Sequence, residues 1–312
     1  MTTSDARARH RRAGLLARHP LPAFFVLAFL GAWVVELPVV LSRTGIGVLP
    51  FTPSRGVIIA LLALATFTGP TAAAFSMSWL TEGRDGVVRL LRRYVRWRVH
   101  IGWYLFVLLA MPIVEVLGAA IVPGAMASFH APTLAMLAAY PLALVWTFAT
   151  GGPLGEEPGW RGFALPRLQS ALGPLAGSVV LGVLWACWHL PLFWSGVWTP
   201  PTVADIVMFI VMITGLTIVM TWVFNNAKGS LLLTMLMHAS FNTFANLVVA
   251  PLFPAPLLEE YGLLPELIGF WVVALIVIAA TRGRLSYARY LRYEEEVSTL
   301  TAARIAASAR TG

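Results

Sequence analysis

Eight long apolar runs divide this chain, and they constrain its fold more than any other feature. They are roughly Leu21–Leu41, Ser54–Leu80, Ile101–Pro123, Pro132–Thr150, Leu172–Trp194, Thr202–Phe224, Ser230–Ala250 and Gly262–Ala280. An α-helix needs about 20 such residues to cross a bilayer. Only 12% of the chain is charged, against about 25% in an ordinary soluble domain. The sequence therefore excludes a soluble or disordered protein and predicts an all-α, polytopic membrane protein with about eight transmembrane helices.

The basic residues predict which side of the membrane each loop faces. Most lie in the N-terminal segment, in the loops after the second, fourth and sixth runs, and in the C-terminal segment, and only Arg43 and Arg55 fall in loops of the other side. Cytoplasmic loops carry an excess of Arg and Lys, so both termini are expected in the cytoplasm. Lys228 is the only lysine, and this preference for arginine is typical of a GC-rich bacterial genome. We expect the bacterial cytoplasmic membrane.

One transmembrane domain, residues 21–280, is expected between a basic cytoplasmic tail at 1–20 and a charged cytoplasmic tail at 281–312. The segment Gly86–Val99 alternates arginine with apolar residues, which predicts an amphipathic helix on the cytoplasmic membrane surface. The net charge of +8 then indicates contact with membrane lipid and not with nucleic acid. Cys187 is the only cysteine, which excludes a disulfide framework and a site built from several cysteines.

Two adjacent acids and an arginine lie beside the fourth apolar run, in Gly-Glu-Glu-Pro-Gly-Trp-Arg-Gly at 155–162. Ionisable residues within spans are functional candidates by default. Glu157 and Arg161 are four residues apart, so on a helix they share a face and can pair. Glu156 then points about 100° away and can face something else.

The residues before this motif break the fourth run. Gly151, Gly152 and Pro153 should interrupt the helix, and a new helix is expected to start near Leu154. Pro158 is tolerable only in the first turn of that helix. Irregular backbone at membrane depth is accepted only where it is buried in protein or lines a cavity, so this break favours a site.

Two further polar groups lie within later runs: His189, at the end of Trp-Ala-Cys-Trp-His, and His238 with Asn242 on one helix face. A single buried histidine is more often a packing residue, and an asparagine in a span commonly joins helices. Together with the Glu-Glu motif, however, these residues favour an active site. Glu36 and Glu115 have no patterned partner, so we expect structural pairing or a place facing a cavity.

These residues resemble a known family. The matching patterns are Glu156-Glu157-x-x-x-Arg161, Trp185-x-x-x-His189 and His238-x-x-x-Asn242. They are similar to the three motifs of the CPBP family of intramembrane proteases, which includes type II CAAX prenyl endopeptidases and bacteriocin-processing or immunity proteins. The similar part, a predicted catalytic core, covers about residues 141–249. Trp185 stands where Phe is usual, and Pro158-Gly159 departs from the simplest form of the first motif.

The resemblance implies catalysis by a glutamate-activated water. Glu156 would be the general base, and His189 would help to hold and polarise the water. His238 and Asn242 would hydrogen-bond the developing oxyanion. No cofactor is expected, but a carboxylate and two imidazoles are also a plausible zinc set. One zinc ion at Glu156, His189 and His238 is therefore kept as an alternative.

The resemblance also implies that Glu157 and Arg161 fix the site through an ion pair. For the chemical groups to meet, the segment 151–161 must lie at membrane depth, close to His189. The polar residues are then expected to converge on one cavity that opens to the cytoplasm.

The expected function is an intramembrane endopeptidase whose substrates are membrane-associated peptides or proteins, of the CAAX type or otherwise lipidated or hydrophobic. A non-catalytic immunity or scaffold protein of the same fold is the main alternative. A transporter is a weaker one, because a second, symmetry-related broken helix would be expected and is not visible in the sequence.

Overall fold

The computed structural model describes residues 14–150, 152–198, 202–245, 252–253 and 261–311. All regular structure within these residues is helical, which confirms the predicted fold class. The helices, in chain order, are α2 (Leu15–Arg18), α3 (Pro20–Leu41), α4 (Arg55–Thr66), η1 (Phe67–Thr71), α5 (Ala72–Tyr94), α6 (Ile101–Ala120), η2 (Met126–Ser128), α7 (Leu134–Thr150), α8 (Pro153–Glu157), η3 (Pro158–Ala164), α9 (Leu165–Leu172), α10 (Pro174–Trp188), η4 (Leu190–Trp194), α11 (Val203–Asn226), α12 (Leu231–Phe244), α15 (Leu264–Thr281) and α16 (Tyr287–Thr311). Here η1 and η3 are π-helical, and η2 and η4 are 3₁₀ turns.

Six helical stretches in the described part of the chain are long and apolar enough to cross a membrane. They are Pro20–Leu41, Arg55–Tyr94, Ile101–Ala120, Pro174–Trp194, Val203–Asn226 and Leu264–Thr281. A seventh is added if α7 and the stretch Pro153–Leu172 form one bent span. α12 is a shorter apolar helix, and residues 246–250 of the predicted seventh run lie outside the described residues. The chain is an integral membrane protein, and the count of eight spans stays a prediction.

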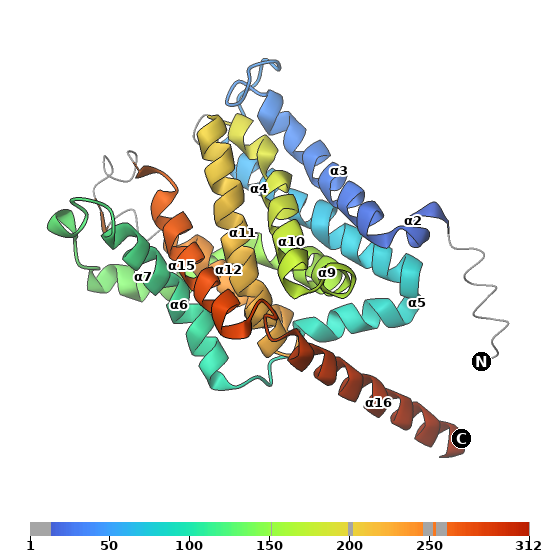
Figure 1. Cartoon of the computed structure of the whole chain (residues 1–312). Coiled ribbons are helices and arrows are strands. Elements are labelled where there is room, and N and C mark those ends of the chain that lie inside the picture. Colours follow the sequence, from blue (N-terminus) through green and yellow to red (C-terminus); the bar gives the residue numbers. More distant parts are fainter. Residues whose placement is uncertain (1–13, 151, 199–201, 246–251, 254–260, 312) are drawn as a thin grey trace.

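Helix α11 lies at the centre of the bundle, packed against α10 and α15 (Figure 1). In its most apolar window 67% of the residues are buried, against 28% for α3, α6 and α15. The outer helices expose large apolar side chains such as Val34, Leu109 and Val145. Extensive apolar surface of this kind marks contact with a membrane, so the outer helices face lipid and α11 faces protein.

The second apolar run extends further than predicted. α4, η1 and α5 form one helical stretch from Arg55 to Tyr94, and Gly83, with φ +64° and ψ −150°, breaks it at a sharp kink. Figure 1 shows the last part of α5 turning away from the first. The predicted amphipathic helix is this last part, and it ends at Tyr94 and not at Val99.

The loop after α5 leaves the helix because other elements hold its backbone. The Ser230 hydroxyl donates to the Arg96 carbonyl oxygen at 2.7 Å, and the Tyr104 hydroxyl donates to the Trp97 carbonyl oxygen at 2.7 Å. These carbonyl groups are thereby satisfied without continuing the helix.

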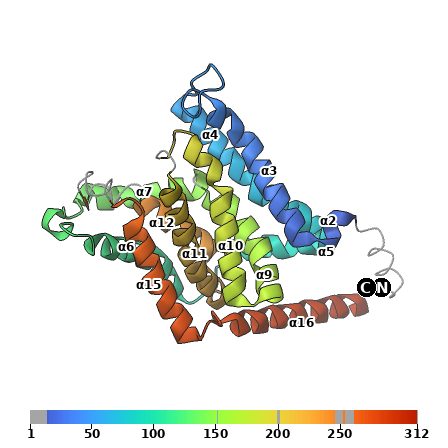
Figure 2. The same ribbon diagram turned by 45° about the horizontal axis from the view of Figure 1, so that its top comes forward.

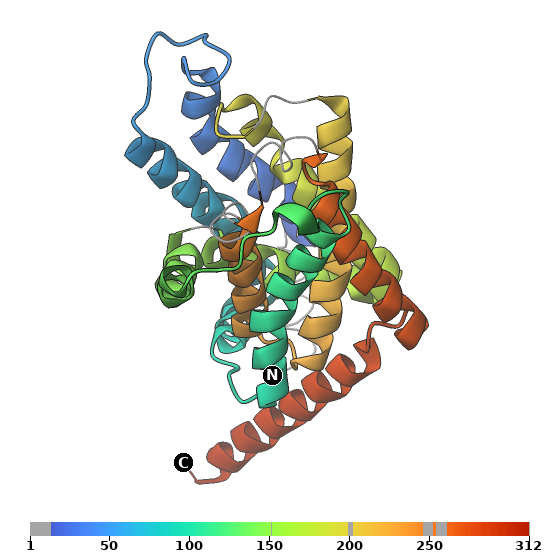
Figure 3. The same ribbon diagram turned by 90° about the vertical axis from the view of Figure 1, so that its left-hand side faces the viewer.

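The C-terminal helix α16 is tied to the last part of α5. Glu294 accepts hydrogen bonds from Arg93 at 3.2 Å and from Arg96 at 2.6 Å, and Arg93 also donates to the Tyr290 hydroxyl at 2.7 Å. Beyond this junction α16 projects from the bundle (Figures 2 and 3). The amphipathic part of α5 and α16 therefore lie on the same side of the molecule.

The fourth run is broken, as predicted. α7 and the stretch Pro153–Leu172 are bent by 42°, Gly152 has φ +100°, and α8 begins at Pro153. Pro158 differs from the expectation, because it lies beyond the first turn of α8 and opens the π-helical turn η3. Proline lacks an N–H and its ring crowds the preceding turn, so the wider π turn accommodates it.

Candidate active site

The Glu-Glu segment packs against the middle of another membrane helix. A side-chain carbon added at Gly155 would lie 2.0 Å from Thr66 Oγ1, and one added at Gly159 would lie 2.6 Å from Pro70 Cβ. Both positions require glycine, because this approach leaves no space for a side chain. Thr66 ends α4 and Pro70 lies in η1. At about 1.5 Å per residue they lie roughly 16 and 22 Å along the helical stretch from Arg55. The contact places α8 and η3 deep in the bundle.

Two indole groups hold the carboxylate of Glu156. Trp185 Nε1 donates to Glu156 Oε2 at 2.7 Å, and Trp160 Nε1 donates to the same oxygen at 3.3 Å. Glu156 is only 4% exposed. Hydrogen bonds to a buried carboxylate replace the water that it loses and fix its orientation. Glu156 is therefore a positioned acceptor at the end of α8.

His189 lies at the junction of α10 and η4 and faces Glu156. Its Nδ1 lies 2.8 Å from the Trp185 carbonyl oxygen. A carbonyl can only accept, so Nδ1 carries the hydrogen and Nε2 of the neutral ring carries the lone pair. Nε2 lies 3.9 Å from Glu156 Oε2, which is too long for a direct hydrogen bond and suits one shared water. The aromatic rings of Trp185, Trp188, Trp198 and Phe209 lie around His189.

Glu157, Arg161 and His238 form a second buried group. Glu157 Oε1 accepts from Arg161 Nη1 at 2.8 Å and from His238 Nδ1 at 2.9 Å. Glu157 and Arg161 are both fully buried, and Arg161 Nη2 also contacts Thr217 Oγ1 at 3.5 Å and Met220 Sδ at 3.1 Å. The ion pair predicted from the four-residue spacing is present. The separate hydrogen bond of His238 Nδ1 to Glu157 leaves Nε2 as the ring nitrogen that faces away from Glu157.

Trp185 connects the two groups. Its ring lies under the Arg161 guanidinium, 4.1 Å from the ring centroid to Cζ, and its centroid is 5.2 Å from that of the His238 ring. Its indole N–H reaches Glu156. Phenylalanine, which is usual at this position of the motif, would keep an aromatic ring and lose this hydrogen bond. Trp185 therefore contributes a hydrogen-bond donor to the site as well as an aromatic ring.

The structure brings most of the predicted site residues together. Glu156 and His189 face each other, and Glu157, Arg161 and His238 are bonded in one group. Asn242 is half-buried in α12, one turn after His238, and residues at this spacing share a helix face. α12 packs against α8, which brings this face towards the Glu-Glu segment.

The zinc alternative stays a prediction. Glu156 and His189 face each other, and the bond of His238 Nδ1 to Glu157 at 2.9 Å leaves Nε2 as the nitrogen that could bind a metal. In the described ranges no group of three or more His, Cys, Asp or Glu side chains is placed to hold a metal ion.

Two further residues belong to this region that the motifs do not identify. Trp160 lies four residues after Glu156, and this spacing could have predicted their hydrogen bond. Glu36 on α3 is 2% exposed and its carboxyl group interacts electrostatically with that of Glu156. No local sequence pattern could relate Glu36 to a residue so distant in the chain.

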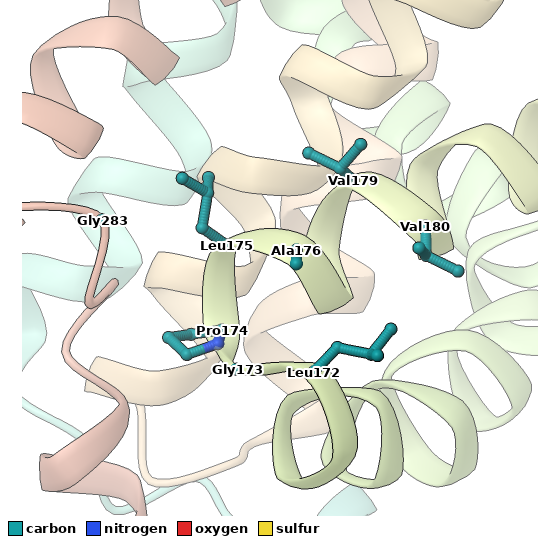
Figure 4. Close-up of a pocket in the computed structure, with 8 residues that line it drawn as sticks. All are labelled: Leu172, Gly173, Pro174, Leu175, Ala176, Val179, Val180 and Gly283. Atoms are coloured by element: carbon teal, nitrogen blue, oxygen red, sulfur yellow. The ribbon is translucent and has the colours of Figure 1, made fainter.

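A separate apolar pocket of about 570 Å³ lies at the turn between α9 and α10. Figure 4 shows its lining, which includes Leu172, Leu175, Val179 and, from the turn before α16, Gly283. None of the candidate site residues lines it. The predicted cytoplasm-open cavity at Glu156 stays a prediction.

Comparison with known proteins supports the resemblance over this same region. Residues 138–244 match the profile of the family described as type II CAAX prenyl endopeptidase Rce1-like. The chain is also 29% identical over 98 residues to CAAX prenyl protease 2 of Methanococcus maripaludis, an alignment that covers 28% of this chain and 34% of that protein. The aligned part thus spans about a third of the relative. The residues matched by the family profile, 138–244, contain every residue of the three motifs.

Proposed function

We propose that this chain is an intramembrane endopeptidase in which Glu156 activates a water molecule. The observation that carries this proposal is the pair of hydrogen-bond acceptors, Glu156 Oε2 and His189 Nε2, facing each other at 3.9 Å. A water between them would donate one hydrogen to each acceptor, and Glu156 would take a proton as the water attacks a peptide carbonyl carbon. No bound metal takes part in this scheme.

The group at Glu157 places a hydrogen-bond donor for the oxyanion that forms as the water adds to the carbonyl carbon. Because His238 Nδ1 donates to Glu157, only Nε2 of His238 is available to an oxyanion, and it donates when the ring is an imidazolium. Asn242 would be the second donor. Within this group Glu157 is paired with Arg161 at 2.8 Å. Burial of balanced, bonded charges is far less costly than burial of an unpaired one.

The substrate class proposed is a membrane-associated peptide or protein, lipidated or hydrophobic near the cleaved bond. The site is surrounded by apolar helices, and the relative from Methanococcus maripaludis is named for a CAAX prenyl substrate class. We further propose that both termini face the cytoplasm of a bacterial cell. A fluorescent reporter fused after α16 should then fold and emit, as it does only on the cytoplasmic side.

The test compares the N- and C-termini of membrane proteins, by mass spectrometry, in cells that produce the wild type or Glu156→Gln. The substitution keeps size and removes the base, so peptide termini made by the wild type should disappear. Glu115→Gln is the matched control, because Glu115 is also a buried intramembrane carboxyl, 1% exposed, outside the site. Identical termini in all three strains, with equal amounts of folded protein, would overturn the proposal and favour a non-catalytic immunity or scaffold protein.

Metal removal separates this scheme from the zinc alternative. Dialysis of the purified protein against a chelator should leave cleavage of a substrate found by the termini comparison unchanged. Elemental analysis should show far less than one zinc per chain. Loss of activity that added zinc restores would instead support a metal at Glu156, His189 and His238.

A further inference from the structure

Glu36 is a buried carboxyl that the proposed mechanism does not yet use. Its side chain is 2% exposed, and among the described residues its Oε2 has no hydrogen-bond partner. It belongs to α3, a helix long and apolar enough to span the membrane. An ionisable group in such a position is costly, which makes it a functional candidate.

The buried face of α3 directs Glu36 towards the site. Ala28, Ala32 and Glu36 follow one another at intervals of four residues, and all three are buried, so they lie on one stripe of the helix. The Ala28 carbonyl oxygen accepts from Trp188 Nε1 at 3.2 Å, and Trp33 Nε1 donates to the Trp188 carbonyl oxygen at 2.9 Å. Trp188 directly precedes His189 in the chain. Glu36 therefore lies on the face of α3 that contacts the C-terminal end of α10.

Glu36 and Glu156 are both buried, and α3 packs against η3 and η4, the turns that directly follow Glu157 and His189, but the surroundings of the two carboxyl groups differ. Glu156 Oε2 accepts two indole hydrogen bonds, which suits an anion. Glu36 Oε2 is enclosed without a donor, which suits a neutral carboxylic acid. Where two acids serve one site, unequal surroundings of this kind assign the base and the acid of the pair.

We propose that Glu36 is the general acid of this site, the group that protonates the leaving amine. The inference rests on the proposed peptidase function. Glu156 takes a proton from water, and the hydroxide adds to the carbonyl carbon to form a tetrahedral intermediate. When the C–N bond breaks, the amine nitrogen takes the proton of Glu36, and the Glu36 carboxylate regains a proton from the Glu156 carboxylic acid. One water is consumed, and both side chains return to their first state.

The first test needs no substrate. The infrared spectrum of the purified protein in lipid nanodiscs should contain a C=O stretching band of a protonated carboxyl that disappears in Glu36→Gln. Glu156→Gln should shift that band, because the neighbour of the Glu36 acid changes from an anion to an amide, and Glu115→Gln should leave it in place. A spectrum of Glu36→Gln that keeps every protonated carboxyl band, or a band unaffected by Glu156→Gln, would overturn the proposal.

The second test uses the chemistry of the leaving group. The probes are two quenched peptides that span a mapped cleavage site, one with an amide and one with a thioester at the cleaved bond. A thiolate, unlike an amine, leaves without being protonated. Glu36→Gln should lower amide hydrolysis by roughly 10²–10⁴-fold, the usual contribution of a general acid, and should change thioester hydrolysis little. Equal losses on both probes would mean a structural role and reject the proposal.

The two hypotheses fail in different ways. If Glu156→Gln still cleaves both probes, the proposed function is wrong. If Glu156→Gln cleaves neither probe while Glu36→Gln cleaves the amide as fast as the wild type, only the assignment of Glu36 is wrong. Both variants should be compared at matched amounts of folded protein, judged by a single gel-filtration peak.

Discussion

Two pairs of acids in the described part of this membrane domain differ in the hydrogen-bond donors around them. Glu156 accepts from two indoles, and Glu157 accepts from Arg161 and His238. The other pair, Glu115 on α6 and Glu266 on α15, interact electrostatically with each other. In the described part of the molecule both oxygens of Glu115 and Oε2 of Glu266 have no hydrogen-bond partner.

The difference between these pairs shows that burial of an acid does not by itself make a site. Charge inside a membrane needs compensation by donors or by opposite charge. Where the fold supplies donors, carboxylates are held in one orientation and can serve chemistry. Where it supplies none, the neutral acid is the state that burial permits. The predictions below test this contrast, from the largest effect to the smallest.

The largest loss of stability and activity is expected when Arg161 is replaced. Arg161→Met leaves the fully buried Glu157 with His238 as its remaining partner from this group, and breaking one side of a buried ion pair costs about 3–5 kcal/mol. The midpoint of thermal unfolding in detergent should fall strongly, and activity should be lost.

The double variant Glu157→Gln/Arg161→Met is the matched control for that prediction. It removes both charges together, so much of the stability should return, while activity stays low because His238 is no longer oriented. If the double variant is as unstable as the single one, the loss reflects packing around Trp185 and not an uncompensated charge.

The second largest loss of activity is expected when the indole groups that donate to Glu156 are replaced. Trp185→Phe keeps an aromatic ring and removes the hydrogen bond to Glu156 Oε2, which is 2.7 Å long. Hydrogen bonds to charged groups contribute about 1.5–3 kcal/mol, so cleavage should slow by roughly 10–150-fold. Trp160→Phe removes the longer bond of 3.3 Å and should slow cleavage less. An equal or larger loss in Trp160→Phe would show that bond length does not rank these donors.

These donors also show how far the sequence predicts the site. The spacing of Glu157 and Arg161 predicts an ion pair on any helix, and the structure contains it. The hydrogen bond of Trp185 to Glu156 joins residues on α10 and α8, and helical spacing says nothing about contacts between helices. The resemblance placed both residues in one site but treated the tryptophan as a conservative replacement of phenylalanine.

Prediction of the fold from the sequence is limited in the same way, by contacts between helices. Apolar runs predict helices well, because in lipid every backbone group must be bonded within its own segment. The bends are harder to predict. Gly83 kinks α5 and Pro158 opens a π turn, and either residue could equally have ended its helix. Which outcome occurs depends on tertiary contacts, such as those of Gly155 and Gly159 with the second span.

A small effect is expected at the junction of α5 and α16. Glu294 bonds to Arg93 and Arg96 outside the bundle core, and its side chain is 24% exposed. Partly exposed ion pairs contribute up to about 1 kcal/mol, so Glu294→Gln should lower the unfolding midpoint slightly and leave cleavage unchanged. The stability difference should shrink as salt is added. A loss of activity comparable with that of Trp185→Phe would instead connect α16 to the site.

The smallest effect is expected at Glu115, the acid without donors. If Glu115 is a neutral acid, Glu115→Gln replaces one uncharged group by another of the same size, and the free energy of unfolding should change by less than about 1 kcal/mol. Glu156→Gln exchanges the same two groups but removes a charge that two indoles bind. Measured side by side, the first variant should keep activity and stability, and the second should lose activity. If Glu115→Gln were as damaging as Glu156→Gln, the contrast between the two acid pairs would fail.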